Sequence, residues 1–208
     1  RSYILGIMSL FGVIFGRFIC GWLCPFGLIQ DLLYKIPSKK IKVNKKVNDL
    51  LKYLKYVILA LFVMILPMFL VNEFGISPPY FCEYICPAGT LEGGIPLLLM
   101  NESLRGVIGY LFVWKMFVLI SISIASIFIY RPFCRYICPL GAFYSLFNKV
   151  SFYKYEVDKN KCTNCSVCVK KCKMNIEIYK NPNSSECIRC GECVKVCPTK
   201  AIKKGFRL

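Results

Sequence analysis

Residues 162–172 read CTNCSVCVKKC and residues 187–198 read CIRCGECVKVCP. Both stretches carry four cysteines in the spacing C-x2-C-x2-C-x3-C. This spacing is typical of two-cluster iron-sulfur proteins, in which the fourth cysteine of each run ligates the other cluster. The sequence therefore predicts two [4Fe-4S] clusters, with one ligand set of Cys162, Cys165, Cys168 and Cys197 and another of Cys187, Cys190, Cys193 and Cys172.

A disulfide framework does not account for two copies of one spacing, so we set it aside. The first run departs from the usual pattern at one position. Lys173 follows its last cysteine, where Pro198 follows the last cysteine of the second run. We expect a weaker turn at Lys173 without the loss of a ligand.

The composition indicates a membrane protein. Hydrophobic residues make up 56% of the 208-residue chain, the mean hydropathy is +0.53, and 28 Lys and Arg against 11 Asp and Glu give a net charge of +17. An apolar, basic chain points to lipid rather than nucleic acid. The sequence has no histidine, which excludes bis-His haem, His-ligated zinc and histidine acid-base chemistry. Arg1 in place of Met predicts a trimmed N-terminus.

Three apolar stretches predict transmembrane helices at Tyr3–Ile19, Tyr56–Val71 and Gly106–Tyr130. We therefore expect a mainly α membrane domain over residues 1–150, with about three transmembrane helices and some interfacial helices. A small α+β ferredoxin domain should follow over residues 151–208. Such a small domain depends on its clusters for stability, because its apolar core alone is marginal.

The charge distribution predicts the topology. The loop Gln30–Lys55 holds eight lysines and two aspartates, whereas Asn72–Arg105 holds four glutamates and one arginine. Because Lys and Arg concentrate on the cytoplasmic side, the first loop and the ferredoxin should face the cytoplasm and Asn72–Arg105 the outside. The predicted location is thus the inner membrane of a bacterial cell, with several passes. Lysines 39–46 suit orientation and lipid contact, with docking of an acidic donor protein as the alternative.

A second repeat, C-x-[W/Y]-[L/I]-C-P-x-G, occurs three times in the membrane part. Copy one is Cys20–Gly27, copy two is Cys82–Gly89 and copy three is Cys134–Gly141. Residues four apart share a helix face, and proline suits the first turn of a new helix. Each copy therefore predicts the end of one helix, a cysteine pair, and a helix start whose free N–H groups favour an anionic cluster.

Copies one and three lie at the predicted cytoplasmic ends of their spans. We expect a third cluster held by Cys20, Cys24, Cys134 and Cys138, with inert buried thiols as the alternative. Copy two is expected on the other side. Its Cys82 and Cys86 form an exposed dithiol, a structural disulfide, or part of a fourth cluster completed by cysteines upstream of Arg1 or on a partner.

Four basic residues near these motifs have two interpretations each. Arg17, Arg131 and Arg135 are either interfacial anchors or cations that act on the nearby thiolates. Lys115, within the third apolar stretch, either extends to the outer interface or faces a cluster or a quinol headgroup.

At Gly16–Gly27, Arg131–Gly141 and the ferredoxin tail, the chain resembles the polytopic membrane ferredoxins that serve periplasmic nitrate reductase and nitrous oxide reductase, with relatives in copper-oxidase maturation. Its middle motif, Pro78–Glu92, is similar to that of a subgroup of anaerobic bacterial proteins. The resemblance implies electron transfer between a quinol or cytoplasmic donor and redox protein partners at or across the membrane. Full-length members of this kind carry a further cysteine-rich segment before the first span.

Three functions follow from these motifs. The first is a membrane-bound electron-transfer protein, a component of an oxidoreductase system. The second is a reductase in which Cys82 and Cys86 reduce a metal ion or a disulfide outside. The third is a redox sensor without sustained electron flux. No nucleotide or flavin motif is present.

Overall fold

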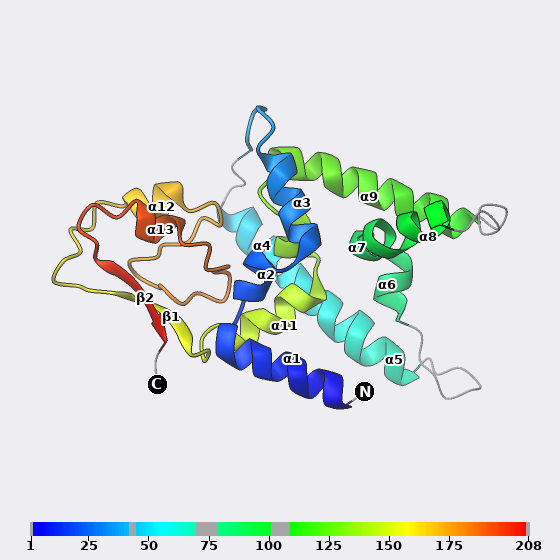
Figure 1. Cartoon of the computed structure of the whole chain (residues 1–208), viewed down its shortest axis with the longest axis horizontal. Helices are drawn as coiled ribbons and strands as arrows, with labels where there is room; N and C mark the ends of the chain where they lie inside the picture. The colour runs from blue at the N-terminus through cyan, green and yellow to red at the C-terminus, as the bar shows by residue number, and fades with distance from the viewer. Residues whose placement is uncertain (1, 42–44, 70–78, 101–108, 207–208) are drawn as a thin grey trace. The chain divides into compact units, whose positions relative to one another are not determined.

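The computed structural model describes residues 2–41, 45–69, 79–100 and 109–206, and it is mainly helical (Figure 1). The chain forms two compact units. Unit 1 combines residues 1–28 with residues 140–208, and unit 2 comprises residues 29–139. The first helices thus group with the ferredoxin segment, whereas the predicted domain boundary lies at residue 150.

Unit 2 contains the two helices that are long and apolar enough to cross a membrane. One is continuous over Val47–Phe69 and the other spans Tyr110–Phe128, with mean hydropathies of 1.9 and 2.2. Few of their side chains are buried within the protein, so both present apolar surfaces that suit lipid. The first of the two consists of α4 (Lys45–Ile58), the π-helix η1 (Leu59–Ile65) and α5 (Leu66–Phe69). The π turns end just before Pro67, which lacks the N–H that a regular helix needs.

These helices correct two predicted boundaries. The helix expected from Tyr56 already begins at Lys45, so much of the predicted loop Gln30–Lys55 is helical, including α3 (Pro25–Tyr34). The helix expected over Gly106–Tyr130 is α9 (Tyr110–Phe128). The predicted ends at Val71 and Gly106 lie outside the described residues.

A third transmembrane helix is not confirmed. α1 (Ser2–Phe15) ends four residues before the predicted limit of Ile19, because Gly16 adopts a left-handed φ of 56°. Its apolar part, Gly6–Phe15, is shorter than the roughly 20 residues that a span requires. α2 (Phe18–Trp22) then starts in a new direction.

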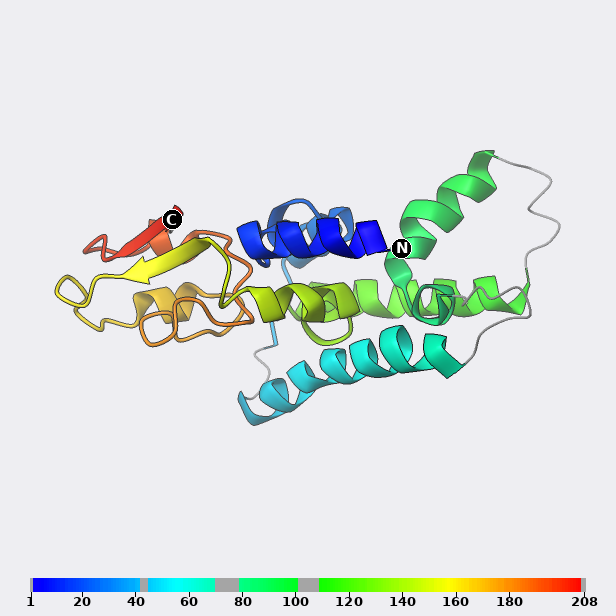
Figure 2. The same ribbon diagram turned by 90° about the horizontal axis from the view of Figure 1, so that it is seen from below.

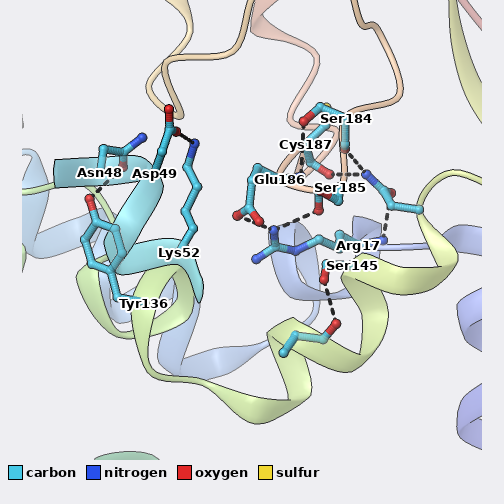
Figure 3. Close-up of polar contacts among 12 residues, drawn as sticks. Arg17, Asn48, Asp49, Lys52, Tyr136, Ser145, Ser184, Ser185, Glu186 and Cys187 are labelled. Atoms are coloured by element: carbon cyan, nitrogen blue, oxygen red, sulfur yellow. Dashed lines mark hydrogen bonds and ion pairs between the residues drawn. The ribbon is translucent and has the colours of Figure 1, made fainter. Parts of the chain in front are cut away.

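The remaining elements of unit 2 surround copies two and three of the membrane motif. They are α6 (Tyr80–Tyr84), α7 (Pro87–Gly89), the π-helix η2 (Thr90–Gly94), α8 (Ile95–Met100) and α10 (Pro132–Tyr136). α10 packs against α4 and α9, and its Tyr136 hydroxyl donates to Asn48 Oδ1 at 2.9 Å (Figure 3). At the turn into α10, Arg131 makes two hydrogen bonds to the carboxylate of Asp31, one of them from Nε at 2.7 Å.

Unit 1 places the ferredoxin segment against helical elements. After α11 (Pro139–Phe147), the antiparallel strands β1 (Tyr153–Val157) and β2 (Ile202–Phe206) pair with Tyr153 opposite Phe206 and Val157 opposite Ile202. Two short helices, α12 (Val167–Lys171) and α13 (Glu192–Lys195), lie between the strands in sequence and pack together. Figure 2 shows the sheet beside these helices. The predicted small α+β ferredoxin is present.

The end of α1 is tightly packed in unit 1. A Cβ atom at Gly16 would lie 2.6 Å from Asn148 Oδ1 and 2.8 Å from an Arg189 guanidinium nitrogen. Both neighbours are buried and hydrogen-bonded, so neither can move freely. Only glycine satisfies both the left-handed backbone and the close approach at this position.

We predict that Gly16→Ala destabilises the protein by about 2 kcal/mol or more, because a left-handed non-glycine residue costs about 1–2 kcal/mol before any steric overlap. Thermal unfolding of the full chain in detergent measures this loss. The matched control is Gly6→Ala, since nothing lies within 4 Å of a Cβ there. Gly6→Ala should be neutral or slightly stabilising. Equal losses in the two variants would contradict this account of Gly16.

Candidate iron-sulfur sites

The first ferredoxin site consists of Cys162, Cys165, Cys168 and Cys197. These four residues line one open cavity with an empty volume of about 370 Å³. The other lining residues come from the ends of both strands, from the loop at Thr163–Ser166, from the segment after Cys197 that leads into β2, and from Tyr179. The structure thus brings the fourth cysteine of the second run to the first three of the first run, which is the exchange that the spacing predicts.

The second ferredoxin site consists of Cys172, Cys187, Cys190 and Cys193. The pKa of Cys187 is raised to about 11 and that of Cys193 to about 12, mainly by burial and in part by the charges of Cys172 and Cys190. This mutual influence shows that the four thiols are neighbours. Thiols so placed suit a multi-iron cluster, since soft thiolates on several sides are what a cubane requires.

The two sites have the same backbone. In each run a residue with positive φ precedes the second cysteine and another follows it: Asn164 and Ser166 at 52° and 59°, and Arg189 and Gly191 at 55° and 83°. A third lies three residues after each fourth cysteine, at Asn175 and Lys200. The turn after Cys172 has the same hydrogen bond as the turn after Cys197, so Lys173 does not remove it. Repetition of this loop explains how one spacing makes two equivalent cages.

The three membrane motifs also share one local geometry, as predicted. Each has a five-residue helix with the first cysteine in its third position, and a second cysteine directly before the proline that starts a new helix. Two N–H groups after each short helix donate to one carbonyl at 2.9–3.2 Å: Leu23 and Cys24 to Ile19, Ile85 and Cys86 to Phe81, and Ile137 and Cys138 to Phe133. This turn places the second cysteine at the start of the next helix, where N–H groups are free.

Copy two shows the effect of those N–H groups on a thiol. The pKa of Cys86 is lowered to about 6, mainly by a hydrogen bond from Cys82 and in part by the N–H groups of Gly89 and Ala88, against the opposing effect of burial. The same hydrogen bond, followed by burial, raises the pKa of Cys82. The Cys86 sulfur is therefore suited to negative charge while Cys82 stays protonated and donates to it.

Copies two and three are neighbours within unit 2, which corrects the prediction that they lie on opposite sides of a membrane. The rings of Phe81 and Phe133 stack at 6.5 Å, and the charge of Cys138 acts on Cys82. Groups on opposite faces would be separated by about 30 Å of hydrocarbon. The charge pattern alone did not reveal that α10 packs against α9 and brings the two motifs together. Lys115 lies close enough to this pair for its charge to favour the Cys82 thiolate.

Copy one lies in unit 1, where it contacts the loop of the second ferredoxin site. A Cβ at Gly21 would lie 2.5 Å from the carbonyl oxygen of Ile188, so the two backbones touch. Gly21 follows Cys20, and Ile188 follows Cys187. Arg17 donates to Glu186 at 2.9 Å and to the Ser185 carbonyl at 3.0 Å in the same region (Figure 3).

The arginines of these motifs are not interfacial anchors. Arg17, Arg131 and Arg135 are each at most 3% exposed. Sequence reasoning also missed Arg189, which is 2% exposed and lies inside the second ferredoxin loop. Its charge favours the thiolate of Cys187. The signal was present in the sequence, since an arginine occupies the position between two ligands where the first run has Asn164.

The predicted third ligand set is divided between the units. Cys20 and Cys24 belong to unit 1, whereas Cys134 and Cys138 belong to unit 2. Within unit 2, the amide of Gln30 donates to the Cys134 sulfur at 3.3 Å. Among the described residues, no three Cys, Asp or Glu side chains converge on a point that would hold a single metal ion. The set of Cys20, Cys24, Cys134 and Cys138 stays a prediction.

Comparisons with known proteins agree with this arrangement. A family described as a 4Fe-4S binding domain matches residues 3–44, 56–95 and 110–154, so each match covers one membrane motif. A second family of the same description matches residues 181–203, which include Cys187, Cys190, Cys193 and Cys197. The chain belongs to the 4Fe-4S binding domain family. The resemblance to membrane ferredoxins is thereby confirmed.

Relatives extend this family membership over nearly the whole chain. Two uncharacterised proteins of Methanocaldococcus jannaschii are 35% and 34% identical, covering 95% and 90% of this chain and 76% and 63% of their own lengths. The putative electron transport protein YccM of Escherichia coli is 25% identical over 77% of this chain and 42% of its own length. The chain thus spans only part of each relative. No solved structure matches it.

We predict that Cys162→Ser and Cys197→Ser abolish the same cluster, because both thiols line one cavity, and that Cys172→Ser abolishes the other. Each variant should lose about four irons per chain and the EPR signal of one ferredoxin site in the reduced protein. Ser166→Ala, in the first loop but without a proposed ligand role, serves as the control. Loss of the same signal in Cys172→Ser and Cys162→Ser would refute the exchanged ligand sets.

Arg189 should raise the reduction potential of the second ferredoxin site, because a buried cation stabilises the added electron. We expect Arg189→Gln to lower that potential by roughly 60 mV, equivalent to a tenfold change in a one-electron equilibrium. Arg189→Lys keeps the positive charge and should therefore keep most of the original reduction potential. The control is Lys195→Gln, since the Lys195 side chain is 74% exposed and solvent screens its charge. An EPR-monitored redox titration at unchanged iron content tests this, and equal shifts in Arg189→Gln and Lys195→Gln would contradict it.

Proposed function

We propose that this chain is a membrane-bound iron-sulfur electron-transfer protein in which the ferredoxin segment and the first membrane motif form one electron path. The contact of Gly21 with Ile188 carries this proposal. It joins a residue next to Cys20 to a residue next to Cys187, without a side chain between the backbones. The cysteines of copy one, Cys20 and Cys24, therefore lie in the same compact unit as the second ferredoxin ligand set, with a short route between them.

The thiol sets fit the cofactor that the family implies. Cys162, Cys165, Cys168 and Cys197 would hold one [4Fe-4S] cluster, and Cys172, Cys187, Cys190 and Cys193 would hold a second. When bound, such clusters supply one-electron redox chemistry at potentials that depend on nearby charge and solvent. The chain's own contribution is to hold the two sets in a fixed relation and to surround the second with buried groups, including the Arg189 cation.

We further propose a third cluster on Cys20, Cys24, Cys134 and Cys138. The common turn in all three motifs supports it, because each places a cysteine at a helix start. The nearness of Cys82 to Cys138 adds a competing partner for copy three. Iron quantitation in Cys20→Ser and Cys82→Ser full chains separates the two pairings: a loss of about four irons in Cys20→Ser alone supports the proposed set.

The proposed donor is a cytoplasmic redox protein or a quinol, and the proposed acceptor lies in the membrane or outside the cell. The description of YccM as a putative electron transport protein supports this role. Two helices fit to cross a membrane supply the anchor, and the ferredoxin is proposed to face the cytoplasm.

Gly21→Ala tests the path directly. A methyl group at 2.5 Å from the Ile188 carbonyl must push the two backbones apart, so reoxidation of the ferredoxin sites by a quinone analogue should slow at least threefold at unchanged iron content. Gly205→Ala, in β2 with nothing within 4 Å, is the matched control. Stopped-flow absorbance of the reduced full chain in proteoliposomes measures the rate. Unchanged reoxidation in Gly21→Ala, or a loss found only in Cys82→Ser, would contradict the proposed path.

A further inference from the structure

Eight exposed lysines lie in the segments of unit 1 that carry or follow cluster ligands, and most of them are near ligands of the first ferredoxin site in sequence. They lie in two segments, 159–173 and 198–204, beside which stand the acidic residues Asp158, directly before the first segment, and Glu156, opposite Lys203 in the sheet. We call this set the basic rim: Lys159, Lys161, Lys170, Lys171, Lys173, Lys200, Lys203 and Lys204. The loop of the second site differs, because it carries Glu186 and Glu192 beside Arg189. The first site is thus the more basic of the two, while Lys170, Lys171 and Lys173 also flank Cys172, and the charge of Lys173 favours the Cys190 thiolate of the second site.

The first site is also the more accessible one. Cys165 is exposed and the other three ligands are half-buried, whereas Cys187 and Cys193 of the second site are buried. Electron tunnelling between proteins falls steeply with distance. A partner therefore gains most by docking where the ligands reach the surface, which is at the first site.

The two sites occupy different positions within unit 1. The loop of the second site contacts the end of α1 and α2 through Gly16, Arg17 and Gly21. The loop after β1, drawn in yellow and leading into the first site, lies at the end of this unit farthest from α1 in both views (Figures 1 and 2). A partner at the first site would thus approach an end of unit 1 that α1 and α2 do not cover.

We propose that the basic rim docks an acidic ferredoxin that acts as the electron donor of this chain. The proposal rests on the function proposed above and names the partner class. In the step, the reduced donor loses one electron and is oxidised, and this chain gains one electron at its first site. No bond forms and no proton moves. Carboxylates on the donor would complement the lysines, which steers association and gives it a strong dependence on salt.

The arrangement of the lysines favours a protein over a lipid surface. Lys203 and Lys204 are successive residues of β2, so their side chains point to opposite faces of the sheet. Lys170 and Lys171 are likewise successive in α12 and diverge around the helix. Such lysines suit a partner that surrounds the exposed end of the site, whereas a flat bilayer would meet only one of the faces.

Binding is measured with the full-length, cluster-loaded protein in nanodiscs of zwitterionic lipid. The probe is an oxidised acidic two-[4Fe-4S] ferredoxin, so that binding is observed without electron transfer. We expect the double variant Lys170→Glu/Lys200→Glu to weaken binding at least tenfold and to reduce its salt dependence. The matched control is Lys35→Glu/Lys39→Glu, which makes the same charge change at exposed lysines of unit 2 and should alter the affinity less than twofold.

Reduction of both variants by photoreduced deazaflavin, a small donor, should proceed as in the unchanged protein. Failure of onward electron transfer with intact, salt-dependent ferredoxin binding would refute the proposed function and leave the docking surface standing. Unchanged affinity in Lys170→Glu/Lys200→Glu would overturn the docking proposal. So would a loss confined to Lys35→Glu/Lys39→Glu, or a loss of binding to anionic phosphatidylglycerol vesicles alone.

Discussion

The buried guanidinium of Arg189 holds unit 1 together. It donates to the carbonyl oxygens of Phe15 and Asn148 and to the hydroxyl of Ser151, and so ties the end of α1 and the segment after α11 to the second ferredoxin loop. Asn148 completes the arrangement, since its amide donates to Ser184 and Cys187 while its oxygen accepts from the Arg17 N–H. Removing one partner would leave several buried groups unsatisfied, at about 1–3 kcal/mol each. The close contact of Gly21 with Ile188 depends on this network.

Both cysteine repeats solve the same electrostatic problem by local backbone geometry. A set of thiolates around a cluster concentrates negative charge, and free N–H groups near the sulfurs offset it. The ferredoxin loops use residues with left-handed backbone on either side of the second cysteine, such as Asn164 and Ser166. The membrane motifs instead use a proline at the start of a helix. The ferredoxin loop occurs twice and the membrane motif three times, so two local sequence patterns account for all the candidate ligand pairs and sets of this chain.

The two ferredoxin sites are alike in backbone and different in surroundings. The first is exposed, with most of the basic rim near its ligands in sequence, whereas the second is buried beside Arg189 and contacts copy one. Surface lysines act on a partner's approach, because solvent screens their charge over short distances. A buried arginine acts on the site itself. In the proposed electron path, this asymmetry would make the exposed first site the point of entry and the second site the link to the membrane motif.

The cysteine spacing by itself determined the ligand types, the family and the local turn at each motif, because these depend on residues a few positions apart. The apolar stretches of the sequence also predicted helices near residues 56–71 and 106–130, since hydropathy is a local property. Only the tertiary structure decided which cysteine motifs lie close to one another. Copy two lies beside copy three because α10 packs against α9, and copy one groups with the ferredoxin because Arg189, Asn148 and Gly16 meet in one buried contact. Such contacts join residues from about forty positions apart, as in Asn148 and Arg189, to more than a hundred, as in Gly16 and Arg189, and no local pattern encodes them.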